Sequence, residues 1–229
     1  MMRFSHILFL SLFTSLYLFS QTRFEALYDF NGCSIKDSKG KIGDLVNVQN
    51  IQCLCGVDND AMVMNVNSFE LPNTFDSLFR SNFTICFDLL IENSFGEIDI
   101  MTKSKLCNSD TTIDISYRSQ DSTFSIFLKE GNDEAYVLFA KADPKSCWQN
   151  VCLSVNGIDI RVYVNGKESV TLIANDLLRL DNGIPVKFNA SDCQNNNLLA
   201  LKGRLDRVMF ANYPFNKDNA NKFFIPQQQ

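Results

Sequence analysis

The sequence predicts an all-β protein, an antiparallel two-sheet sandwich of the jelly-roll type with at most one short C-terminal helix. Three observations favour this class. Apolar and polar residues alternate along many short segments, which is typical of strands that bury one face. Turn signals such as Asn-Gly separate these segments. Eight cysteines follow an N-terminal export signal, as in exported domains that disulfides stabilise.

The N-terminus has the pattern of a signal peptide. Arg3 lies in a short first region, and residues 7–19 carry no charge. That apolar run is typical of secretion signals and too short for a membrane-spanning helix. We expect cleavage after Ser20, which makes 1–20 the signal peptide and 21–225 the folded domain; the alternative is a retained N-terminal anchor. No later segment is apolar for long enough to span a bilayer, so we expect a secreted or cell-surface protein.

Alternation and turn residues define the expected strands. Asn156-Gly157 and Asn165-Gly166 are tight-turn pairs, and apolar residues alternate with polar ones between them. A short helix is expected at 216–224, and 226–229 has the composition of the start of a linker. We expect strands at 26–31, 44–48, 61–66, 68–71, 83–91, 97–103, 111–118, 123–129, 135–140, 148–155, 158–164 and 204–211, with weaker ones near 168–173 and 185–189.

All the cysteines lie after the predicted cleavage site. An even number in an exported chain indicates disulfides, although eight cysteines allow 105 pairings. We expect Cys33 to pair with Cys53 or Cys55, and Cys107 with Cys193. A zinc site is the alternative, but Cys53-x-Cys55 lacks a second close pair at ligand spacing. The remaining cysteines are Cys86, Cys147 and Cys152.

The residue content excludes several kinds of site. His6 is the only histidine, and it lies in the predicted signal peptide. The mature chain therefore lacks the base of a Ser-His-Asp or Cys-His system and any histidine ligand for a metal. The net charge is −5 and no basic stripe is present, so nucleic acid is not an expected partner.

Five motifs occur in order along residues 24–224. In that order they resemble the laminin-G-like, concanavalin-A-like jelly-roll domains, although Gln149 stands where histidine is common and Arg207 where a second aspartate is common. The resemblance implies the two-sheet fold and leaves the function open, since this fold serves lectins, adhesion modules and hydrolases. The motifs are Tyr28-Asp29-Phe30-Asn31-Gly32, Phe83-Thr84-Ile85-Cys86-Phe87, Trp148-Gln149-Asn150-Val151, Val162-Tyr163-Val164-Asn165-Gly166 and Gly203-Arg204-Leu205-Asp206-Arg207-Val208.

A second resemblance concerns the export context. Phe19-Ser20-Gln21 and the Cys53-x-Cys55-Gly56 unit look like those of exported Bacteroidetes proteins. The similarity implies a link to type IX secretion or gliding motility, with an envelope complex as the setting.

Glu97, Asp99 and Thr102 form the one pattern that resembles a catalytic site. It is similar to the Glu-x-Asp-x-x-Glu strand of laminarinase- and lichenase-type glucanases, in which two glutamates act as nucleophile and acid. Thr102 stands where the acid would be, and a hydroxyl cannot serve as a general acid at neutral pH. We therefore expect no enzyme and interpret Glu97 and Asp99 as solvated strand carboxylates; a degenerate, sugar-binding relative of the glucanases is the alternative.

The resemblance also implies a structural calcium ion between the first and last strands. Asp29 and Asp206 are the residues that it points to, since calcium prefers oxygen ligands. The alternative is that Asp206 bonds locally, for example with Arg204 or Arg207.

Tyr163 and Phe127 are the candidate ligand-binding residues. Both lie out of phase with their apolar neighbours, which could place them on a concave outer face; packing beneath loops is the alternative. The predicted function is a non-catalytic binding module, for a glycan or in adhesion. A structural component of a cell-surface protein complex is the alternative function.

Overall fold

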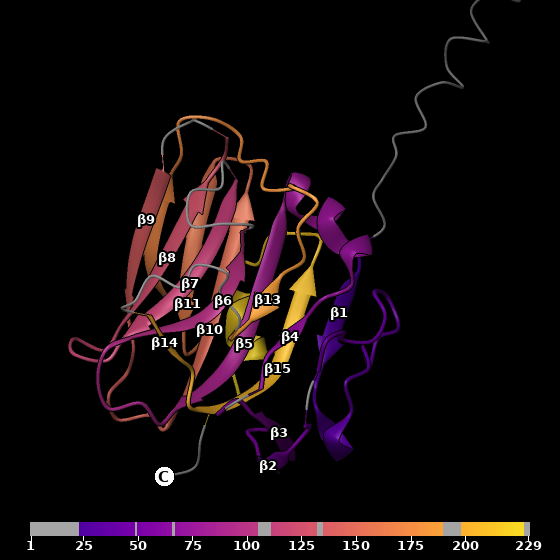
Figure 1. Cartoon of the computed structure of the whole chain (residues 1–229). Helices are drawn as coiled ribbons and strands as arrows, with labels where there is room; N and C mark the ends of the chain where they lie inside the picture. Colours follow the sequence, from indigo (N-terminus) through magenta and orange to yellow (C-terminus); the bar gives the residue numbers. More distant parts are fainter. Residues whose placement is uncertain are drawn as a thin grey trace, which may run out of the picture.

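Two sheets pack face to face in the computed structural model, which describes residues 23–48, 50–65, 67–104, 111–131, 135–189 and 198–226 (Figure 1). The predicted signal peptide lies outside these residues. Pairing is antiparallel throughout the described ladders, except that β14 runs parallel to β6. The fold is therefore the all-β sandwich that the alternation predicts.

The eight-stranded sheet has the order β12-β11-β10-β5-β15-β3-β2, and β1 pairs with β15. Both Asn-Gly pairs turn as predicted, joining β10 to β11 and β11 to β12. The strands are β1 (Glu25–Tyr28), β2 (Cys53–Cys55), β3 (Asp60–Val63), β5 (Phe83–Ile91), β10 (Trp148–Asn156), β11 (Asp159–Val164), β12 (Lys167–Ile173) and β15 (Gly203–Ala211).

The seven-stranded sheet has the order β4-β13-β6-β7-β8-β9, with β14 beside β6. Its last four strands form a meander that ends at the edge strand β9. The strands are β4 (Phe69–Glu70), β6 (Glu97–Lys103), β7 (Thr112–Arg118), β8 (Thr123–Lys129), β9 (Ala135–Lys141), β13 (Lys187–Phe188) and β14 (Leu198–Ala200).

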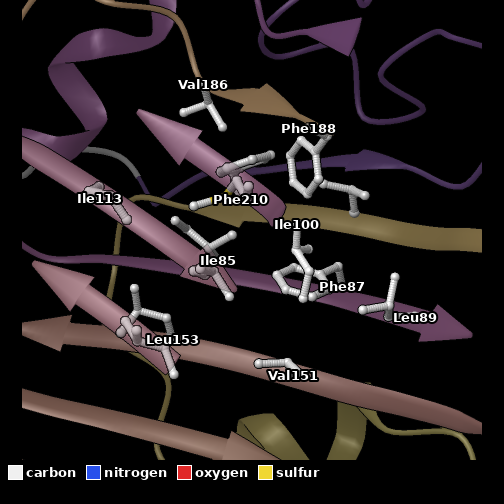
Figure 2. Close-up of a cluster of buried hydrophobic side chains, with 14 of the residues drawn as sticks. Ile85, Phe87, Leu89, Ile100, Ile113, Val151, Leu153, Val186, Phe188 and Phe210 are labelled. Atoms are coloured by element: carbon white, nitrogen blue, oxygen red, sulfur yellow. The ribbon is translucent and has the colours of Figure 1, made fainter. Parts of the chain in front are cut away.

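The core lies between the sheets. Figure 2 shows Ile85, Phe87 and Leu89 of β5, which alternate with outward-facing residues, beside apolar side chains of the other sheet. The rings of Phe87 and Phe188 cross the interface edge to face, with centroids 6.0 Å apart. Alternating side chains from both sheets thus interdigitate, as in packed sandwiches.

Helices are few in the described part of the chain. The predicted C-terminal helix is present as α1 (Lys217–Phe223), and Asn216 and Asn219 form its capping box. Two 3₁₀ helices, η1 (Asn31–Cys33) and η2 (Asn73–Arg80), were not expected. None of the helices described is long and apolar enough to cross a membrane.

The strand expected at 44–48 is wrong. Only Val46 forms a bridge there, to Glu70, because this segment belongs to a loop that Asp37 organises through four backbone N–H groups. The short strands β2 and β14 were not expected, since three residues are too few to show an alternating pattern.

Two disulfides occur among the described residues. Cys33 pairs with Cys53, which confirms one of the two partners expected for Cys33. Cys86 pairs with Cys152 across β5 and β10, a bond that the sequence did not indicate. Cys55 and Cys147 are free and exposed. The predicted Cys107–Cys193 bond lies outside the described residues.

Candidate functional site

The outer face of the seven-stranded sheet gathers polar and aromatic side chains from four adjacent strands. Ile113, Ile115, Ile126 and Leu138 point into the core and are buried, so their alternate neighbours point outward. Cross-strand pairing then places the outward residues in rows. We call this set the open face: Glu97, Asp99, Thr102, Asp114, Ser116, Arg118, Ser125, Phe127, Val137 and Phe139.

A bulge in β6 shapes one end of the open face. The register shifts between Asp99 and Met101, so that Asp99 pairs with Ser116 while Thr102 pairs with Asp114. The extra residue returns Thr102 to the side of the sheet that Glu97 and Asp99 occupy. The glucanase-like motif is therefore presented on one face, as expected for Glu97 and Asp99.

Of the two carboxylates in this motif, Asp99 is not the solvated group that the sequence suggested, and Glu97 is half-buried. Asp99 is only 8% exposed, and Glu97 accepts a hydrogen bond from Ser116 Oγ at 2.8 Å. Thr102 Oγ1 donates to Asp114 Oδ1. Burial raises the pKa of Asp114, and the bond from Thr102 opposes that rise. Neighbouring hydroxyls thus hold the carboxylates of the open face in place.

Aromatic and aliphatic side chains occupy the other end of the open face. Phe139 is 52% exposed and Val137 is 43% exposed. Phe127 is half-buried and lies between Asp114 and Val137 in its row, which is the outer position that its phase predicted. The Arg118 guanidinium lies 4.9 Å from the centre of the Phe139 ring, a distance typical of a cation–π contact.

Val137, Phe139, Arg118 and Asp114 are residues of this face that sequence reasoning missed. The segment Ala135–Lys141 is apolar on both sides, so its pattern does not tell which side faces out. Only the pairing of β9 with β8 identifies the exposed set.

Tyr163 does not lie on an exposed face, and that expectation is wrong. It points outward from the eight-stranded sheet, but it is fully buried and its hydroxyl donates to the Phe215 carbonyl at 3.4 Å. Thr84 and Ser154 also bond to the segment after β15. This C-terminal segment, residues 212–224, covers the outer face of the eight-stranded sheet. Tyr163 therefore packs beneath another segment, which was the alternative to ligand binding.

Asp29 and Asp206, the predicted calcium ligands, both accept hydrogen bonds from backbone N–H groups. Asp29 accepts the backbone N–H of Asn31 at 3.2 Å. Asp206 is fully buried and accepts backbone N–H groups of Val57, Asp58 and Arg207 at 2.8, 3.1 and 2.7 Å. Donors of this kind satisfy a carboxylate without a cation. No group of three or more acidic, His or Cys side chains in the described ranges could hold a metal, and calcium binding stays a prediction.

A buried ion pair beneath the C-terminal segment was also missed. Arg207 Nε donates to Asp88 Oδ2 at 2.5 Å, and Asn150 donates to the other oxygen at 2.8 Å. Burial raises the pKa of Asp88 to about 6, against the opposing charge of Arg207. Arg207 Nη1 donates to the Phe223 carbonyl at 2.9 Å. The pair therefore fastens α1 to the sheet, and the one sequence signal was the arginine inside an apolar strand.

Comparison with known proteins shows the fold. No family model matches the chain, and no curated protein is similar to it. Domain 4 of AbnA, an extracellular arabinanase of Geobacillus stearothermophilus, solved in complex with arabinotriose, has a TM-score of 0.68 at 16% identity, covering 87% of this chain and 97% of that one. The binding domain of Paraclostridial Mosquitocidal Protein 1 has a TM-score of 0.70 at 20% identity, covering 87% and 51%.

A third similar structure concerns botulinum neurotoxin type C, whose cell entry depends on interaction with two ganglioside molecules. It has a TM-score of 0.58 at 13% identity and covers 87% of this chain and 50% of that one. The chain thus spans about half the length of these toxin domains and nearly all of the arabinanase domain. At these identities the similarity establishes a β-sandwich like those of known binding domains.

Proposed function

We propose that this protein is a non-catalytic binding domain that recognises a saccharide on the open face. The observation that carries the proposal is the exposed ring of Phe139, which lies on the same face as Phe127 and in one cross-strand row with the hydroxyls of Ser125 and Ser116. Sugar rings present apolar C–H faces that pack on aromatic rings, and sugar hydroxyls bond to carboxylates. The half-buried side chains of Glu97, Ser116 and Ser125 can supply the polar contacts, whereas Asp99 and Thr102 are only 8% and 1% exposed and support the face from within.

The similar structures support a binding role. One was solved with arabinotriose and another is described by its dependence on gangliosides. The disulfides Cys33–Cys53 and Cys86–Cys152 support an extracellular location, because such bonds persist in oxidising compartments. The link to type IX secretion and gliding stays part of the prediction.

We infer that the open face does not catalyse glycoside hydrolysis. That reaction needs two carboxyl groups facing a scissile bond from opposite sides. Glu97 is bonded to Ser116, while Asp114 is bonded to Thr102 in the place where an acid would act. Contact without cleavage is the function that this geometry supports.

A glycan array tests the proposal, followed by titration of each saccharide that binds. We expect Phe139→Ala to weaken binding by roughly two- to tenfold, since stacking contributes about 0.5–1.5 kcal/mol. Phe95→Ala is the matched control, because Phe95 is 70% exposed on the loop before β6 and lies outside the open face. Absence of any bound saccharide, or an equal loss in the control, would refute the proposal.

A protein partner is the second candidate, as in an assembly component of a surface complex. The observation that favours it is the position of Val137 and Phe139 on β9, the last strand of its sheet. Edge strands readily accept another strand. Co-purification from the native envelope separates the two candidates: a stoichiometric protein partner without saccharide affinity would favour assembly.

A further inference from the structure

A pocket of about 360 Å³ lies where β1, the loop after η1 and the C-terminal segment meet. Its lining includes Arg23, Lys39 and Lys41, with Glu25 and Tyr213 beside them. Three exposed cationic residues thus line one open pocket in a chain whose net charge is −5. Figure 1 shows β1 on the opposite side of the molecule from β9, so this pocket is separate from the open face.

The loop that carries the two lysines is built around a buried carboxylate. Asp37 is 7% exposed and accepts the backbone N–H groups of Leu27 and Lys39 on one oxygen, each at 2.9 Å. Its other oxygen accepts those of Lys41 and Ile42 at 2.5 and 2.9 Å. Asp37 therefore fixes the backbone at both lysines.

The pocket is cationic, because Glu25 is the one acidic residue in a lining that holds three basic ones. Glu25 accepts a hydrogen bond from the Tyr213 hydroxyl, and Arg23 lies 5.1 Å from the centre of the Tyr213 ring. Among the described residues, no carboxylate forms an ion pair with Lys39 or Lys41. Two lysines without such an ion-pair partner in one pocket favour an anionic ligand, and an arginine fork adds directional donors.

We propose that the Arg23–Lys39–Lys41 pocket binds a small ligand through an oxyanion group, a carboxylate, sulfate or phosphate. The volume suits a ligand of monosaccharide size, at the lower end of ordinary ligand pockets. This inference does not depend on saccharide binding at the open face.

Calorimetric titration with glucuronate, glucose 6-sulfate, glucose 6-phosphate and glucose tests the proposal. We expect at least one charged probe to bind and glucose not to bind, and the tightest probe identifies the oxyanion. Binding should disappear near 1 M salt, where the Debye length is about 3 Å. Failure of all three charged probes, or equal binding of glucose, would overturn the proposal.

Paired charge variants locate the site. Lys39→Gln with Lys41→Gln should weaken the best probe by roughly tenfold, since an exposed ion pair contributes up to about fivefold. Lys167→Gln with Lys202→Gln removes the same charge from exposed positions elsewhere and should change affinity by less than about twofold. Both double variants should keep the wild-type melting temperature, because Asp37 bonds to the backbone of Lys39 and Lys41, and Lys167 and Lys202 are exposed. An equal loss in the two double variants would contradict the assignment.

Discussion

Arg207 is the charged side chain on which the packing of the C-terminal segment depends. Its guanidinium is paired with Asp88 and lies over the Phe223 ring, 4.7 Å from its centre. Arg207→Met leaves a buried carboxylate without its cation, so we expect a loss of about 3–5 kcal/mol in the free energy of unfolding. Urea denaturation of wild type and variant measures this loss in the free energy of unfolding.

Arg80→Met is the matched control. Arg80 is paired with Asp181 at 2.9 Å, but its side chain is 69% exposed. The expected loss is less than about 1 kcal/mol. Similar losses in the two variants would show that the buried pair contributes no more than a surface pair.

Asp206 gives the stability a dependence on pH. Burial raises its pKa to about 6, although three backbone N–H groups oppose the rise. Because the folded protein holds this proton more tightly than the unfolded chain, the contribution to stability is greatest at low pH and is lost as the pH rises towards 6 and beyond.

Asp206→Asn removes this contribution. We expect the stability difference between wild type and variant to shift by up to about 3 kcal/mol between pH 4 and pH 7, against wild type as the pH rises. Denaturation at several pH values measures the shift. A difference that stays constant with pH would show that Asp206 does not titrate in this range.

Single residues show that the alternation of side chains along a strand does not by itself predict their exposure to solvent. Phe127 and Tyr163 both point outward from their sheets. Phe127 is half-buried on the uncovered side of the sandwich, whereas Tyr163 is fully buried on the covered side. Alternation tells which side of its own sheet a residue occupies, but not whether a distant segment packs there. The burial of Tyr163 depends on the C-terminal segment, some fifty residues later.

At the scale of elements, the start of β15 depends on a close approach to β5. Gly203 has φ +150°, and a Cβ added there would overlap the Leu90 carbonyl oxygen. Gly203→Ala should therefore separate the strands and lower the melting temperature by several degrees, in line with a loss of about 1–3 kcal/mol. Gly131→Ala is the control for backbone strain alone, because Gly131 also has a positive φ but a Cβ added there would meet no other atom. Equal melting temperatures would argue against the close approach.

Long strands could be predicted from the sequence and short elements could not. β5, β7, β8, β10 and β11 agree with expectation to within one residue at either end, because each is long enough, at six to nine residues, to show a strand pattern between turn residues. The bulge in β6 has no such signal, since one inserted residue alters the pattern only locally. The open face was therefore only partly predictable: Glu97, Asp99 and Phe127 were identified, but not the residues opposite them.

At the scale of the whole molecule, cysteine chemistry tests the fold. Native alkylation should modify Cys55 and Cys147, which are free and exposed. Cys33, Cys53, Cys86 and Cys152 should react only after reduction. Mass spectrometry of peptides reads the pattern directly, and labelling of Cys86 before reduction would contradict the bond between β5 and β10.

The fold class could be predicted in full, because alternation and turn chemistry act along the whole chain. The disulfide between Cys86 and Cys152 could not be predicted, because it depends on which strands become neighbours. Cys86 and Cys152 are 66 residues apart in sequence and face each other only through the pairing of β5 with β10.

The C-terminal segment leaves the two sides of the sandwich unequal. Residues 212–224 cover the outer surface of one sheet, while part of the other remains open. If the open face binds a ligand as proposed, a monomer of this shape presents one ligand-binding sheet face, so it cannot bridge two ligand-bearing surfaces through opposite faces of the sandwich. Agglutination through the open face would therefore require two copies to associate back to back.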